Sequence, residues 1–267
     1  MIREPVVAGQ FYPSGPKELE KIIISLKSKE EPKLQALGII LPHAGYIYSG
    51  KVAVATISKI IPKKRIIILG PNHTGAGEDF GIFSEGKWNM PFKDIEIDQD
   101  LASRILERSN FIKKDYLAHK HEHSIEVELP ILQYFFGEFK FVPIVCALSS
   151  ISTYKKVAEE IHLAIEDIKD QVLLIASSDM SHYEEDSVAR KKDRFAIESI
   201  LNLDEEELLR RINKENISMC GVAPVSILIA CCKRLKAKKA QVILYQTSGD
   251  SSGDYSSVVG YLGAVIN

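Results

Sequence analysis

The sequence predicts a single α/β domain over residues 1–267, in which a mostly parallel central sheet is flanked by helices on both faces. Two observations support this class. Short apolar runs end abruptly in polar segments, as is typical of parallel strands buried on both faces; they cover residues 37–41, 65–69, 172–176 and 242–245. Segments with helical spacing separate these runs, as expected for βαβ units. The length suits one large domain with a full core.

The segments between and around these runs predict the other elements. Residues 5–13 mix proline, glycine and aromatic residues without helical spacing, so we expect an extended arm. Ser14 is expected to cap a helix that has Pro16 in its first turn and continues to Leu26. Helical spacing predicts further helices at 50–60, 98–108, 124–136, 153–168, 187–201, 204–212 and 223–235, with a strand at 139–147. The last strand, 256–266, is expected to pair with 242–245 as an antiparallel hairpin at the sheet edge.

Composition narrows the class of function. Lys and Arg total 34 against 36 Asp and Glu, a formal charge of −2, so we expect no nucleic-acid partner. No stretch approaches the roughly 18 apolar residues of a membrane span, and the N-terminus lacks the apolar core of a signal peptide. We therefore expect a cytoplasmic protein with no membrane partner. The 4 cysteines do not form a disulfide pattern and are expected to be reduced.

Polar residues that follow the predicted strands form the candidate site. His43, His73, Asp179 and His182 each come shortly after an apolar run. Ligands bind outside the carboxyl ends of parallel strands, so these side chains are expected to converge although they are distant in sequence. Two histidines and one anionic ligand, with open coordination positions, form the usual site of non-haem Fe(II) proteins.

The third ligand is left open by the residues alone. Asp179, Glu126, Asp250 and the thiolate of Cys220 are all candidates. Cys220 directly precedes a predicted helix, whose positive end is expected to lower the pKa of the thiol. The other cysteines lie in apolar segments and are expected to be packing residues: Cys146, Cys231 and Cys232.

The histidine-rich stretch 119–123 contributes one further candidate. His123 and Glu126 are three apart at the start of a predicted helix, where they are expected to point together into the pocket. His119 and His121 are expected to lie in a solvated loop. Residues 249–253 fit the Gly-x-Ser-x-Gly pattern of serine hydrolases, but no histidine follows them, so we predict a turn whose Asp250 or Asp254 faces the site. The sequence has neither a phosphate-binding loop nor a His-Glu-x-x-His zinc motif.

Taken together, these segments resemble the Memo family, named for a mediator of receptor-tyrosine-kinase-driven cell motility. The matching segments run in order through the chain: 5–13, 42–50, 69–73, 122–130, 177–183, 220–221 and 258–261. The resemblance implies a fold similar to that of the LigB-type class III extradiol dioxygenases, which normally carry a non-haem iron. It also implies radical-SAM and AMMECR-type proteins as possible partners.

The resemblance assigns roles to individual residues. It implies that His43 and His73 are metal ligands and that Cys220 is the third ligand, where the dioxygenases have a glutamate. Some relatives have two adjacent histidines where this chain has His73 and Thr74, and we assign the ligand to His73. His182 resembles the acid/base residue of the dioxygenases. The remaining residues implied to line the site are Asp179, His123 and Glu126.

Three functions are compatible with these residues. The first is a metal-dependent oxidoreductase that acts on an unknown substrate, with Fe(II) expected and copper or zinc as alternatives, since a thiolate ligand is softer than a carboxylate. There His182 would accept a proton and later return it. The second is a non-enzymatic module that binds anionic or phosphotyrosine peptides through the same pocket. The third is hydrolysis by a zinc-activated water.

Overall fold

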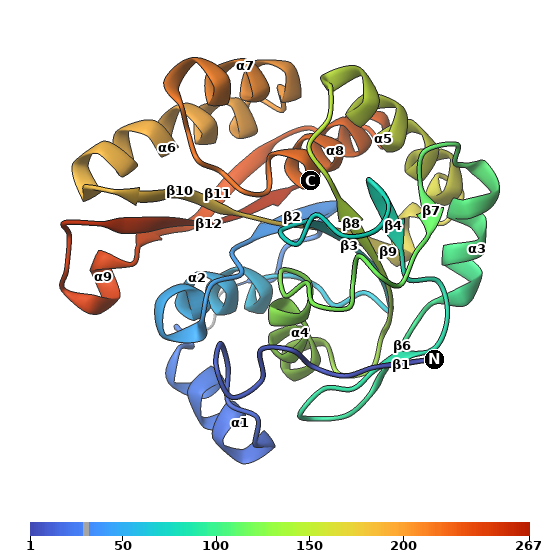
Figure 1. Ribbon diagram of the computed structural model, residues 1–267, viewed down its shortest axis with the longest axis horizontal. Coiled ribbons are helices and arrows are strands. Elements are labelled where there is room, and N and C mark those ends of the chain that lie inside the picture. Colours follow the sequence, from blue (N-terminus) through green and yellow to red (C-terminus); the bar gives the residue numbers. More distant parts are fainter. Residues whose placement is uncertain (29–31) are drawn as a thin grey trace.

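The computed structural model describes residues 1–28 and 32–267 and is organised around one large sheet (Figure 1). Its strand order is β10-β12-β2-β9-β3-β8-β4-β7, with β11 paired to β12. Four central strands run parallel: β2 (Gly38–Leu41), β9 (Val172–Ser177), β3 (Arg65–Pro71) and β8 (Lys140–Cys146). The flanking strands are β4 (Phe80–Ile82), β7 (Lys113–Lys114), β10 (Asp179–Glu184), β11 (Ala240–Thr247) and β12 (Val258–Ile266). The predicted fold class is confirmed.

Helices cover both faces of this sheet, which explains why its central strands are apolar without alternation. In β3, Ile67 and Leu69 belong to one core, and Ile66 and Ile68 belong to the other. The first core packs under α3 (Gln99–Arg108), α5 (Ile151–Ile165), α6 (Asp186–Leu201), α7 (Glu205–Glu215) and α8 (Val222–Arg234). The second packs under α1 (Pro16–Ser25), α2 (Tyr46–Ser58) and α4 (Leu129–Phe136).

The N-terminal segment lies against the second core. Its first strand, β1 (Ile2–Arg3), joins a small sheet with β5 (Lys87–Trp88) and β6 (Ile95–Glu96). From there the chain passes α4 and reaches α2, as the dark blue ribbon in Figure 1 shows. It turns back at a bridge between Ala8 and Tyr12, and the amide of Tyr46 in α2 donates to the carbonyl of Phe11 at 2.8 Å. The predicted arm is therefore fixed to the body of the protein.

Three predicted elements differ from the structure. The expected helix 124–136 is a 3-10 turn, η1 (Glu126–Glu128), followed by α4, because Pro130 can occupy the first turn of a helix but not its interior. Gly15, not Ser14, is the N-cap of α1, and it makes no side-chain cap bond. The expected polar loop after β9 is strand β10, which pairs antiparallel with β12 and places His182 opposite Val259.

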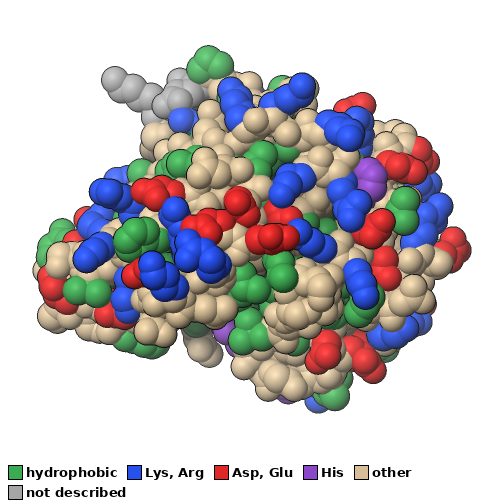
Figure 2. Space-filling view, turned by 90° about the horizontal axis from the view of Figure 1, so that it is seen from above, with side chains coloured by type: hydrophobic (Ala, Val, Ile, Leu, Met, Phe, Trp, Pro, Cys, Tyr) green, Lys and Arg blue, Asp and Glu red, His purple; other side chains and the backbone are tan. Residues whose placement is uncertain are grey.

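The carboxyl-terminal elements agree more closely. β11 and β12 pair antiparallel, as the hairpin prediction required. The predicted turn at 249–253 is a single helical turn, α9 (Gly249–Ser252). In the described parts of the chain, no helix is both long and apolar enough to span a bilayer. On the face shown in Figure 2, acidic and basic side chains are interspersed, as the balanced composition leads one to expect.

Candidate metal centre

Two central strands each deliver a histidine just beyond their carboxyl ends. A single residue separates the end of β2 from His43, and the same spacing places His73 after β3. These strands lie on either side of β9 and run in its direction, so both histidines reach the same edge of the sheet. His43 is buried, with 3% of its side chain exposed, whereas the His73 side chain is 33% exposed.

A third histidine comes from the segment between β7 and α4. His123 precedes η1, so the turn of a helix does not set its direction. The segment comes close to β3 because Gly70 has no side chain: a Cβ there would lie 2.6 Å from the Ser124 Oγ. This contact brings His123 beside the loops that carry the other two histidines.

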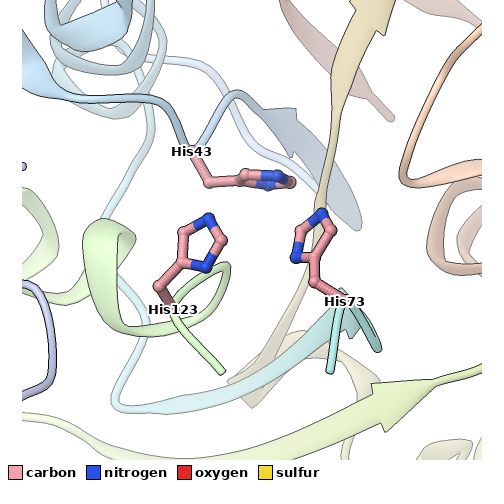
Figure 3. A group of neighbouring side chains, drawn as sticks. All are labelled: His43, His73 and His123. Carbon is pink, nitrogen blue, oxygen red and sulfur yellow. The ribbon is translucent and has the colours of Figure 1, made fainter. Parts of the chain in front are cut away.

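The three imidazoles face one another around one point (Figure 3). The ring centroids of His43 and His73 are 5.2 Å apart, and those of His43 and His123 are 5.6 Å apart. His73 and His123 stack with centroids 4.9 Å apart. One nitrogen from each ring lies within 4.8 Å of the others. Imidazole nitrogens are ligands for zinc, copper, iron and nickel, so this donor set fits a transition-metal ion.

Glu122 fixes the orientation of His73. Its carboxylate accepts from the Nδ1 of His73 at 2.9 Å and from three backbone amides, those of His73, His123 and Ser124. Burial opposes ionisation of Glu122, but the bonds and charge from His73 outweigh it and lower the pKa to about 2. Because a carboxylate only accepts, Nδ1 of His73 carries a proton, and in the neutral ring Nε2 holds the lone pair that a metal can take.

Ser177, at the end of β9, fixes His43. Its Oγ lies 2.8 Å from the Nδ1 of His43, 2.8 Å from the carbonyl of Ser124 and 3.0 Å from the carboxyl of Glu128. Because the hydroxyl proton goes to the Ser124 carbonyl, its lone pair receives the Nδ1 proton of His43. Nε2 of His43 therefore holds the lone pair of the neutral ring, and the Sγ of Cys220 lies 3.3 Å from it. Burial raises the pKa of Glu128 well above its usual range and lowers that of His43.

Asp179 and Cys220 both contact His43, and His182 follows Asp179 in strand β10. The amide of His43 donates to Asp179 at 2.8 Å, and the Sγ of Cys220 lies 3.3 Å from Nε2 of His43. Nδ1 of His182 lies 2.8 Å from the carbonyl of Ser218. A carbonyl only accepts, so the Nδ1 of His182 carries a proton, and Nε2 is the basic nitrogen of the neutral ring.

The predicted thiolate at Cys220 differs from what the structure shows. Cys220 does precede α8, but burial raises the pKa of its thiol, and the charge of Asp179 raises it further. Burial also raises the pKa of Asp179, to about 6. Among the described residues, the contact of Cys220 with the three histidines is its Sγ at 3.3 Å from Nε2 of His43, and Cys220 is outside the set of three nitrogens within 4.8 Å of one another. The residue that completes this set is His123, which the sequence placed in the lining of the site.

Glu126 does not accompany His123. Its fully buried carboxylate turns toward the N-terminal arm, where it forms an ion pair with Arg3 at 2.7 Å. The expectation that Glu126 and His123 point together assumed an α-helix through both residues, but the 3-10 turn starts only at Glu126.

Three other residues considered in the sequence analysis form contacts away from the three histidines. Asp250 pairs with Arg190 at 2.8 Å, and Asp254 bonds to Ser256. His119, expected in a solvated loop, is fully buried, and its Nε2 bonds to the carbonyl of Gly81 at 2.9 Å. Sequence reasoning overlooked the supporting residues Glu122, Ser177 and Arg3. Glu122 and Ser177 stand beside or within segments that were singled out, but no local spacing shows which side chain a carboxylate or hydroxyl will meet.

Comparisons with known proteins agree with this architecture. The sequence profile described as Memo-like protein matches residues 3–265. A MEMO1 family protein of Methanopyrus kandleri is 40% identical over 279 residues, covering 99% of each chain. One from Aquifex aeolicus is 41% identical over 266 residues, covering 99% of this chain and 98% of its own. The crystal structure of an uncharacterized protein from Escherichia coli K12 has the same fold, with a TM-score of 0.54 and 9% identity over 85% of this chain and 98% of that one.

Proposed function

This chain belongs to the Memo family, and we propose that it is a metal-dependent oxidoreductase whose ion is held by His43, His73 and His123. The observation that carries the proposal is the convergence of three imidazole nitrogens within 4.8 Å of one another. His73 and His43 each have Nδ1 engaged, by Glu122 and Ser177 respectively, so that Nε2 is directed to the ion. Such outer partners are characteristic of metal-binding histidines.

We propose Fe(II) as the ion, because the resemblance of the family to extradiol dioxygenases favours non-haem iron. Copper and zinc are the competing ions, since three imidazoles bind all three metals. The bound ion would supply Lewis acidity and, for iron or copper, one-electron redox chemistry.

The protein's own residues provide access and proton transfer. The exposed fractions of the His73 and His123 side chains, 33% and 24%, leave one side of the centre open to a substrate. Nε2 of His182 is the basic nitrogen that would take a proton from a bound substrate and return it, since Nδ1 is engaged by the Ser218 carbonyl. The pKa of Asp179, raised to about 6 by burial, suits a second proton-holding group beside it.

Recognition of anionic or phosphotyrosine peptides has less support from the side chains. A phosphate-binding site uses arginine donors that are free to form bidentate bonds. Arg3 contacts the segment carrying His123, and it donates to Glu126 and to three backbone carbonyls instead.

The proposal is tested by metal content. Tag-free protein purified without oxygen and loaded with Fe(II) should contain close to one ion per chain by elemental mass spectrometry. His43→Ala, His73→Ala and His123→Ala should each lose the ion. His121→Ala is the matched control: it lies in the same histidine-rich stretch, is exposed, and should retain the ion.

Each outcome has a definite meaning. If the loaded, unmodified protein contains zinc or copper but no iron, the metal that binds would replace Fe(II) as the assigned ion. Absence of all three metals would remove the oxidoreductase proposal and make anionic peptides the next ligands to test. Equal losses in His121→Ala and His123→Ala would indicate non-specific binding by the histidine-rich stretch.

A further inference from the structure

A buried carboxylate holds the N-terminal arm against the segment that carries His123. Glu126 is fully buried, and within the described part of the chain its hydrogen-bond donors come from residues 3–12. The backbone amides of Val6 and Val7 donate to it at 2.9 and 3.0 Å, and the hydroxyl of Tyr12 donates at 2.7 Å. Arg3 completes the set at 2.7 Å. Both oxygens of Glu126 therefore accept hydrogen bonds from the arm and hold it in place.

Arg3 connects Glu126 to the loop that precedes it. Besides its bond to Glu126, the guanidinium donates to the carbonyl of His119 at 2.8 Å and to the carbonyl of Glu122. It also lies over the ring of Trp88, 3.9 Å from the centroid. Planar guanidinium groups can donate in several directions at once, which an ammonium cannot do with the same geometry. Arg3 thus fixes both ends of residues 119–126.

This loop, in turn, fixes two of the three histidines. The backbone of Glu122 is bonded to Arg3, and its side chain accepts from His73 and from the amide of His123. The arm also contacts His123 directly, because the ring of Phe11 meets the imidazole edge to face at 5.0 Å. A shift of the arm would therefore move both the support of His73 and one face of His123.

We infer that the N-terminal arm, residues 3–12, is a positioning element of the metal centre, and that Arg3 acts through the 119–126 loop to set the geometry of His73 and His123. This inference rests on the proposed metal-binding function. Arg3 touches neither the ion nor a substrate, so it is a positioning residue. The competing explanation is that Arg3 and Glu126 contribute only to the stability of the fold.

The two explanations differ in what a double substitution does. Removing one member of a buried ion pair leaves the other charged and without its partner, which is strongly destabilising, whereas removing both together is often tolerated. Arg3→Met with Glu126→Gln removes both charges but also removes the bonds from Arg3 to the carbonyls of His119 and Glu122. A purely structural role predicts unchanged metal binding in folded double-variant protein.

The experiment measures Co(II) affinity, with the visible spectrum of the bound ion as a reporter of its coordination geometry. We expect the folded double variant to bind Co(II) about 10-fold more weakly, at the lower end of the effect of losing an outer partner of a metal site, because Glu122 stays in place but loses the support of Arg3. The bands of the bound ion should also shift. Arg3→Lys keeps a positive charge beside Glu126 but not the directed donors. It should fold with an unfolding midpoint nearer to that of the unmodified chain and still show weaker binding and shifted bands.

A matched pair elsewhere provides the control. Arg65 and Asp98 form a partly buried ion pair at 2.6 Å at the other end of β3, and Arg65→Met with Asp98→Asn removes it. This control should lower the unfolding midpoint and leave Co(II) affinity within about twofold, since no outer partner of the centre is lost.

Co(II) affinity and spectra of the Arg3 variants that match those of the unmodified chain would overturn the inference. So would a loss of affinity in the Arg65 control as large as that at Arg3. Failure of the unmodified chain to bind Co(II) is a separate result, because it would overturn the proposed function along with the inference drawn from it.

Discussion

The two walls of the centre hold their ionisable groups in opposite ways. In the histidine wall, His43, His73 and His123, outer hydrogen bonds hold Nδ1 of His43 and Nδ1 of His73, and the backbone amide of His123 donates to Glu122. Glu122 is ionised, with a pKa of about 2. In the acid–thiol wall, Asp179, His182 and Cys220, burial raises the pKa of the carboxyl and of the thiol, which favours their protonated forms.

This difference indicates a division of labour. Lone pairs supported by outer hydrogen bonds suit the binding of a cation, whereas groups that keep or exchange protons suit acid/base chemistry. If this division is correct, substitutions should weaken metal binding most behind the histidine wall and least in the acid–thiol wall.

The largest effect is expected at Glu122. In Glu122→Gln an amide group would meet donors at His73, His123 and Ser124 that now share a carboxylate, so at least one of its N–H groups would oppose another donor. We expect metal affinity to fall about 10- to 100-fold, as for other outer partners of metal-binding histidines. Competition with a chromophoric chelator measures this. An affinity within twofold of the unmodified chain would show that the histidine wall does not depend on its carboxylate.

A smaller effect is expected at Ser177. Ser177→Ala removes one neutral hydrogen bond to His43, so affinity should fall about 2- to 10-fold, the equivalent of about 0.5–1.5 kcal/mol. It also removes the Oγ that partners the buried carboxyl of Glu128, whose other oxygen has no hydrogen-bond partner among the described residues. Urea unfolding should therefore show a loss of about 1–3 kcal/mol. Ser177→Thr, which keeps the hydroxyl, is the control for the bond itself.

The sequence could predict the site residues that directly follow the central strands. Apolar runs that end in Pro42 and His43, or in Asn72 and His73, place histidines at the carboxyl edge of a parallel sheet, because register and direction follow from burial on both faces. The same pattern placed Asp179 beside the centre.

The part that could not be predicted depends on contacts between distant segments. His123 reaches the centre because its loop packs on Gly70, and Glu126 is drawn away by an arm more than 100 residues earlier in the chain. β10 forms although its sequence is polar, since its partner β12 supplies the pairing. Spacing within a segment carries no information about such partners, and burial at Cys220 outweighed the local effect of the helix end.

A substitution at Cys220 tests whether a residue of the acid–thiol wall also binds the metal. Cys220→Ser keeps the shape of the side chain but removes the softer ligand atom. Because Cys220 lies outside the set of three nitrogens and contacts it at His43, 3.3 Å away, we expect metal content to be retained and affinity to change about threefold or less, below the usual effect of an outer partner. Elemental mass spectrometry and chelator competition measure both quantities. Loss of the ion in Cys220→Ser, like the loss expected in His43→Ala, would instead show that Cys220 is a ligand. Cys220 would then belong with the metal-binding residues of the histidine wall.

The smallest effect on metal binding is expected at His182, together with a large effect on turnover. The backbone amide of His182 donates to the Oγ of Ser218 at 2.7 Å, and its Nδ1–H donates to the Ser218 carbonyl. The ring is therefore held through Nδ1, and Nε2 is its basic nitrogen. In His182→Asn the side-chain amide can replace the Nδ1–H donor, but no basic nitrogen remains.

We therefore expect His182→Asn to keep its full metal content, while oxygen uptake with any substrate oxidised by the loaded, unmodified protein falls about 10²- to 10⁴-fold, the usual contribution of an acid/base residue. Metal loss in this variant would place His182 among the ligands. Full turnover would leave proton transfer to Asp179, whose pKa of about 6 would then set the pH at which the rate changes. Metal loss in His182→Asn would contradict the proposed division of labour, because the acid–thiol wall would then contribute to metal binding as well as to proton transfer.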